Sequence, residues 1–172
     1  MAWRNTENGF GLISRMIHWA MAALVVGLLI LGLFIANMQP SLANLWLYGA
    51  HKTAGIIALC LVLARIIWHK ISPVSAPMGD ISQLAKWAHR ALYACLILMP
   101  LSGWIASSAT GLDVIIFDAV TLPAIAPVSE AWENAGFALH RATAYLLMAV
   151  LALHIAGALI RRDGTLARMI WG

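Results

Sequence analysis

The chain has 172 residues, of which 62% are hydrophobic and only 10% are charged, and its net charge is +4. A water-soluble domain usually carries about 25% charged residues, so this composition excludes an ordinary soluble globular protein. The chain must present its apolar surface to lipid, which predicts an all-α membrane protein.

Four apolar runs are long enough to cross a bilayer. We expect helices over about residues 17–37, 51–68, 88–107 and 139–160, all within one domain that covers residues 1–172. About 20 helical residues cross a hydrocarbon core. In lipid, helices satisfy their own backbone polar groups, and these runs lack the alternating pattern of barrel strands. The sequence therefore predicts a bundle of four transmembrane helices.

Cationic residues gather on one side of these helices. Lys52 and Arg141 lie on the opposite side, together with four acidic residues. The larger group is Arg4, Arg15, Arg65, Lys70, Lys86, Arg90, Arg161, Arg162 and Arg168. Because positively charged loops stay in the cytoplasm, we expect both termini there and a multi-pass protein of the bacterial inner membrane. The basic residues lie where membrane orientation requires them, so nothing supports nucleic-acid binding.

The third run and the connection after it carry two local signals. Pro100 predicts a kink in the helix, and Gly103 follows it where another helix or a flat ligand can approach. The connection over residues 109–138 mixes apolar and acidic residues. We therefore expect at least one short helix that lies along the membrane surface.

Histidines are the main candidates for function, because ionisable side chains inside a membrane are costly. Five of the six lie in or at the ends of the predicted helices: His18, His51, His89, His140 and His154. The sixth, His69, ends the second helix, where an interfacial role is expected. Imidazole is a common axial ligand of heme iron.

The spacing of His140 and His154 is the sharpest feature. Fourteen residues separate them, which places both rings on one helix face, about 21 Å apart along the axis. That spacing permits two hemes at two depths. His51 matches the depth of His140, whereas either His18 or His89 matches the depth of His154.

Arg65 follows His51 by the same fourteen residues. It is therefore expected on the same helix face at the inner depth, where a heme propionate would supply the anion that it needs. Gly55, one turn after His51, leaves room for a flat ring.

Two other interpretations of the histidines stay open. They could form hydrogen bonds between helices, or they could build a proton or metal pathway. A zinc site fits poorly, because it needs its ligands at one depth.

These motifs, in this order, resemble the bacterial cytochrome b-561 family of four-helix diheme proteins. The resemblance runs nearly end to end, through GLISRMIHW, HKTAG, LAKWAHRALY, MPLSGW, TLP, FALHRATAYLL and LALHIAGAL. It implies two heme b groups, one held by His18 and His154 on the cytoplasmic side and one held by His51 and His140 on the outer side. His89 then lies beside the ligands or near a quinone.

The resemblance also implies electron transfer between the periplasmic face and the quinone pool. One activity of the family is superoxide oxidation with ubiquinone as the electron acceptor. Lys52 and Arg141 directly follow the two outer histidines and could attract the superoxide anion, or they could anchor propionates or lipid. Four residues are candidates to border the quinone: His89, Arg90, Lys86 and Asp80.

A second function uses the same ligands. The chain could be a cytochrome b subunit that exchanges electrons between quinol and a periplasmic dehydrogenase or another redox partner.

Overall fold

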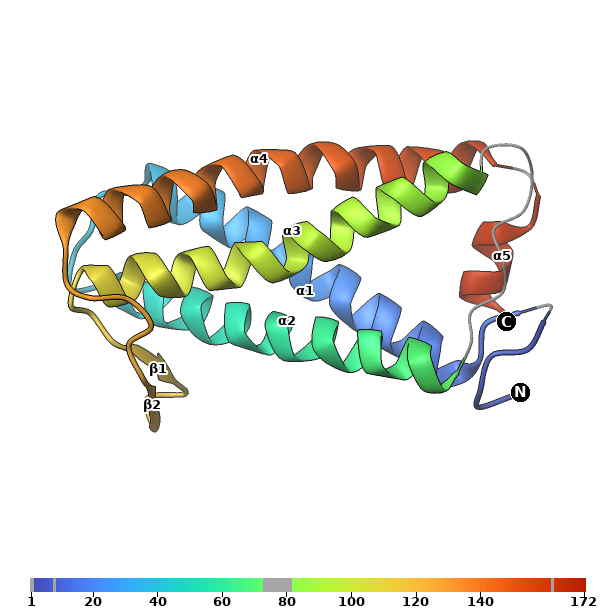
Figure 1. Cartoon of the computed structure of the whole chain (residues 1–172), viewed down its shortest axis with the longest axis horizontal. Coiled ribbons are helices and arrows are strands. Elements are labelled where there is room, and N and C mark those ends of the chain that lie inside the picture. The colour runs from blue at the N-terminus through green and yellow to red at the C-terminus, as the bar shows by residue number, and fades with distance from the viewer. Residues whose placement is uncertain (1, 8, 73–81, 162) are drawn as a thin grey trace.

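The computed structural model describes residues 2–7, 9–72, 82–161 and 163–172. Its elements are α1 (Leu12–Asn37), α2 (Leu45–Ile71), α3 (Ser82–Ala109), β1 (Val114–Ile116), β2 (Val120–Leu122), α4 (Glu130–Ile160) and α5 (Thr165–Ile170). The four long helices form a bundle with both termini at one end and the two strands at the other (Figure 1). We call these ends the termini end and the hairpin end.

The four predicted spans are confirmed as four helices that are long and apolar enough to cross a membrane. The helices extend past the apolar runs. α4 begins nine residues before residue 139, and α2 begins six residues before residue 51. Hydropathy finds only the part of a helix that crosses hydrocarbon, whereas Glu130 and Glu133 in the first turn of α4 favour a helix start outside it. His51 and His140 therefore lie inside their helices rather than at the start.

The expectation of a short surface helix between residues 109 and 138 is wrong. β1 and β2 form an antiparallel hairpin there, with Val114 opposite Leu122. Phe117 and Asp118 in its turn have φ angles of 51° and 55°, as in the tight turns that match strand twist. Short β-branched segments favour strands over a helix, and the later part of the connection forms the first turns of α4.

The bundle has an apolar cluster in its interior and exposed apolar side chains on its outer faces. Val25, Cys95 and Leu147 form a buried cluster between the helices. On the outside, Ile30 is 65% exposed and Leu153 is 70% exposed. Such exposed apolar faces suit a bilayer and not water.

At the termini end, the short helix α5 is hydrogen-bonded to the start of α1. Arg15 in α1 donates from Nη1 to the Ile170 carbonyl at 2.8 Å, and Trp19 donates from Nε1 to the Met169 carbonyl at 3.1 Å. Just before α5, hydrogen bonds from Thr165 and the nearby Arg161 guanidinium lower the pKa of Asp163 to about 2. The C-terminal segment is thus held against the start of α1.

α3 and α4 approach closely at Gly136. A Cβ added there would lie 2.9 Å from the Ala106 Cα atom. We expect Gly136→Leu to force the two helices apart and to lower stability by about 1–3 kcal/mol, the usual cost of overpacking. Thermal unfolding in detergent measures this loss, with Gly157→Leu as control because a Cβ at Gly157 meets nothing within 4 Å. Equal midpoints for both variants would contradict the close contact.

Candidate functional site

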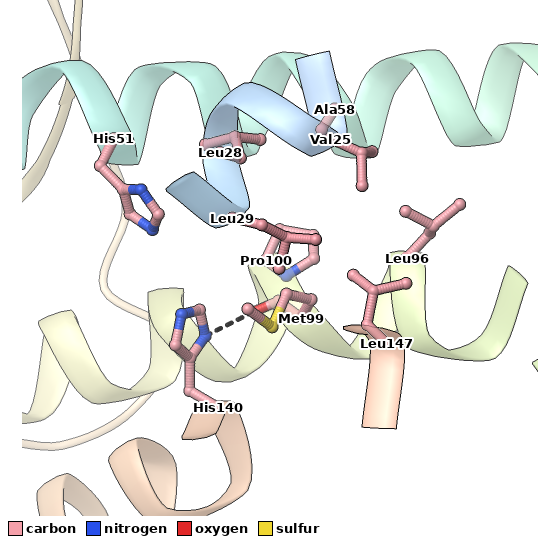
Figure 2. Close-up of a pocket in the computed structure, with 11 residues that line it drawn as sticks. Val25, Leu28, Leu29, His51, Ala58, Leu96, Met99, Pro100, His140 and Leu147 are labelled. Carbon is pink, nitrogen blue, oxygen red and sulfur yellow. Dashed lines mark hydrogen bonds between the residues drawn. The ribbon is translucent and has the colours of Figure 1, made fainter. Parts of the chain in front are cut away.

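Two histidines face each other near the hairpin end. His51 on α2 and His140 on α4 have ring centroids 6.3 Å apart and ring planes at 79°. Figure 2 shows both side chains pointing into the same space from opposite helices. The pairing expected from matching depths is therefore present in the structure as a close contact.

The imidazole of His140 is oriented by α3. Its Nδ1 atom donates to the Met99 carbonyl at 2.8 Å (Figure 2) and lies 3.2 Å from the Ser102 hydroxyl. Because the proton is on Nδ1, the Nε2 lone pair is free for a metal. Pro100 lies beside this carbonyl inside α3, and the helix changes direction near its middle (Figure 1).

Two glycines make room for the rings. A Cβ at Gly103 would lie 3.0 Å from His140 Cε1, and a Cβ at Gly32 would lie 3.1 Å from His51 Cε1. Gly103 was expected at a close approach, but Gly32 was missed, since one glycine in an apolar helix carries no distinctive signal. A Cβ at Gly55 meets nothing within 4 Å, so that position is open as expected.

An apolar cavity adjoins this pair. Residues from all four long helices line it, including Leu29, Ala58 and Leu96 beside the two histidines. Within the described part of the chain, the buried Nδ1 atom of His51 has no hydrogen-bond partner. Buried polar atoms without partners are rare, and this one is on a ring that faces a second imidazole across apolar surroundings.

A second pair lies toward the termini end. His18 on α1 and His154 on α4 have ring centroids 6.3 Å apart and ring planes at 56°. His89 on α3 is closer to His154, with centroids 5.2 Å apart. All three histidines predicted at the inner depth thus come together, and the His154 ring lies near both of the others.

The distances favour one partner for His154. Two imidazole nitrogens on opposite sides of one metal, each about 2 Å from it, place the ring centroids roughly 6 Å apart. Both 6.3 Å pairs fit this separation, whereas the 5.2 Å separation of His89 and His154 is too short for it. Among the described residues, no group of three or more His, Cys, Asp or Glu side chains is arranged to hold a metal ion.

Arg65 lies at the inner pair. Its Nη1 atom donates to His18 Nδ1 at 3.0 Å, and its Nε atom donates to the Tyr93 hydroxyl at 3.0 Å. His69 also reaches this group, because its Nδ1 atom is 3.2 Å from the same hydroxyl. The sequence offered only an interfacial role for His69 and no role for Tyr93.

The two outer cations lie in different surroundings. Lys52 is partly buried and donates from Nζ to the Asp113 carbonyl beside the hairpin at 3.2 Å. Arg141 is exposed and lines a surface groove on α4 with Asn134 and Tyr145.

The candidate quinone residues that the structure describes, His89 included, are exposed. Lys86 is exposed, and the Arg90 guanidinium lies 4.8 Å from the centre of the Trp87 ring. Asp80, and Arg162 of the cationic group, lie outside the described residues.

Comparison with known proteins agrees with this geometry. The family model described as prokaryotic cytochrome b561 matches residues 9–172. The protein named cytochrome b561 homolog 2 of Escherichia coli strain K12 is 31% identical over 181 residues, which cover 99% of this chain and 95% of that protein. The resemblance seen in the sequence is confirmed: the chain belongs to the prokaryotic cytochrome b561 family of heme-binding membrane electron-transfer proteins.

Proposed function

We propose that the chain binds two hemes b and transfers electrons from superoxide at the hairpin end to ubiquinone at the termini end. The observation that carries this proposal is the repeated geometry of the histidines. Two imidazole pairs, at two levels of one bundle, have the same centroid separation of 6.3 Å. A single catalytic metal site would need only one such pair, whereas electron transfer across a membrane needs a redox group at each of two levels.

In this proposal His51 and His140 hold the outer heme, and His18 and His154 hold the inner one. Each heme supplies an iron that accepts and releases one electron. The Met99 carbonyl keeps the His140 proton on Nδ1. The apolar cluster around Val25 keeps water out of the bundle between the two levels.

The inner site requires one exchange of partners. Arginine only donates, so the bond from Arg65 makes His18 Nδ1 an acceptor and leaves the proton on Nε2. Ligation through Nε2 therefore needs Arg65 to release His18. A heme propionate is the anion that would take the guanidinium, in the role that the sequence suggested.

The overall reaction balances with these two substrates alone. Two superoxide anions each give up one electron and become dioxygen. One ubiquinone takes those two electrons and two protons and becomes ubiquinol. In this proposal the termini end, where most cationic residues lie, faces the cytoplasm of an inner-membrane protein. The protons then come from that side, where His89, Lys86 and Arg90 border the proposed quinone position.

Lys52 and Arg141 should speed the capture of superoxide. We expect the double variant Lys52→Gln/Arg141→Gln to lose roughly tenfold in kcat/KM for superoxide at low ionic strength, with a weaker salt dependence, because their positive field no longer attracts the anion. Lys70→Gln is the control, since Lys70 is exposed in the last turn of α2 at the opposite end. Heme content should be unchanged in both variants. An unaltered rate and salt dependence would remove the two cations from the mechanism.

The proposal is tested first by the absorption spectrum of the purified protein. A reduced b-type spectrum at two hemes per chain, followed by ubiquinol formation when superoxide is supplied, supports it. A colourless protein made with adequate heme supply would refute heme binding by these histidines.

One observation favours the second candidate function, a subunit that works with a redox partner. Apolar side chains are exposed around the hairpin, with Phe117 73%, Val120 56% and Val128 75% exposed. Such a surface suits contact with another protein. In that case the isolated chain would bind both hemes but would form no ubiquinol from superoxide, and a dehydrogenase or similar partner would be needed to reduce or oxidise it.

A further inference from the structure

A run of three hydrogen bonds leads from the inner histidine pair to His69, which the proposed electron transfer does not use. Arg65 on α2 joins His18 on α1 to Tyr93 on α3, with both contacts at 3.0 Å. The Tyr93 oxygen then lies 3.2 Å from His69 Nδ1. Three helices are linked through these four polar side chains, in a bundle that is otherwise mostly apolar.

The direction of these bonds follows from what each group can donate. The Tyr93 oxygen must accept from Arg65 Nε, because a guanidinium has only donors. The hydroxyl hydrogen is then free to be donated to His69 Nδ1. A hydroxyl that accepts and donates at the same time has its single proton held in one direction, and each bond of such a chain strengthens the next.

The spacing on α2 explains why one tyrosine can serve both residues. Arg65 and His69 are four residues apart, so their side chains lie on the same helix face. Tyr93 approaches this face from α3, and its ring meets the His69 ring edge to face with centroids 6.2 Å apart. Its hydroxyl therefore lies between a donor and an acceptor on a neighbouring helix.

We propose that Tyr93 and His69 are positioning residues that fix the Arg65 guanidinium at the inner heme site. This inference rests on the proposed function. The bond to Tyr93 uses Nε and so does not occupy the terminal nitrogen Nη1, which reaches His18 of the inner pair. If Nη1 exchanged His18 for a propionate, the Nε bond would keep the guanidinium at the same level. A cation fixed near the iron favours the reduced state, because that state carries one positive charge less.

The test is a redox titration of the purified holoprotein, in which the inner and outer hemes titrate as two components. Tyr93→Phe removes only the hydroxyl, and His69→Leu removes its acceptor. In both variants we expect the inner potential to shift downward, the outer potential to stay constant and the heme content to stay at the wild-type level. His69→Gln keeps an acceptor oxygen and should restore much of the inner potential.

Two further variants separate positioning from packing. Tyr145→Phe is the matched control, because Tyr145 is 61% exposed on α4, and it should shift neither potential. Arg65→Lys keeps the charge but lacks the Nε donor to Tyr93, so adding Tyr93→Phe to it should shift the potential no further than Arg65→Lys alone does.

An inner potential that stays at the wild-type value in Tyr93→Phe and His69→Leu would overturn the inference while leaving the diheme proposal intact. A wild-type protein without heme would instead overturn the proposed function, and this inference with it.

Discussion

His154→Ala should remove the inner heme and leave the outer one in place. His154 supplies one of the two imidazoles of the inner pair, and its partner His18 alone gives the iron a single protein ligand. The outer pair of His51 and His140 should persist, because His140 is fourteen residues away on the same helix, about 21 Å along the axis. The heme-to-protein ratio should fall from two to one.

His89→Ala is the control that makes this result specific. His89 lies closer to His154 than His18 does, with centroids at 5.2 Å instead of 6.3 Å, so both candidates occupy the same level. We expect His89→Ala to keep both hemes and His18→Ala to lose the inner one. If the loss occurred in His89→Ala and not in His18→Ala, the ligand assignment would be reversed, and two hemes in His154→Ala would reject it.

The sequence predicts the depth of His18 and His89 but not which of the two lies opposite His154. Depth in the membrane follows from counting residues along a helix, so the pairing level of all three inner histidines could be predicted. Which ring lies opposite His154 depends on the rotation of α1 and α3 about their own axes. That rotation is set by packing between helices, and the apolar residues on all sides of these helices leave no pattern to indicate it.

Some features of the site follow from local sequence patterns, whereas others depend on contacts between helices that no such pattern indicates. The pair of histidines fourteen residues apart was visible because the period of the helix is fixed. The roles of Gly32 and Tyr93 could not be predicted in this way, because they depend on contacts with side chains of a neighbouring helix. The hairpin was missed because three-residue strands are too short for their alternation to outweigh an amphipathic interpretation.

Gly103→Leu should weaken the outer heme site without changing any ligand. Gly103 on α3 faces the His140 imidazole, and a Cβ there would already lie 3.0 Å from Cε1. A leucine must push the ring away from the position that the Met99 carbonyl fixes at 2.8 Å. Disturbing the groups that orient a ligating histidine typically costs 10- to 100-fold in metal affinity, so we expect a roughly 10- to 100-fold weaker outer heme site.

A graded series makes this prediction sharper. Gly103→Ala needs a shift of only a few tenths of an ångström in the ring, so it should weaken the outer site less than Gly103→Leu does. Gly27→Leu is the matched control, because it places the same side chain on a transmembrane helix where a Cβ meets nothing within 4 Å. Heme titration of the apoprotein, followed by absorbance, gives the affinity of each site. Full outer-heme affinity in Gly103→Leu would mean that His140 can bind from another orientation, and the close approach of α3 would then serve helix packing alone.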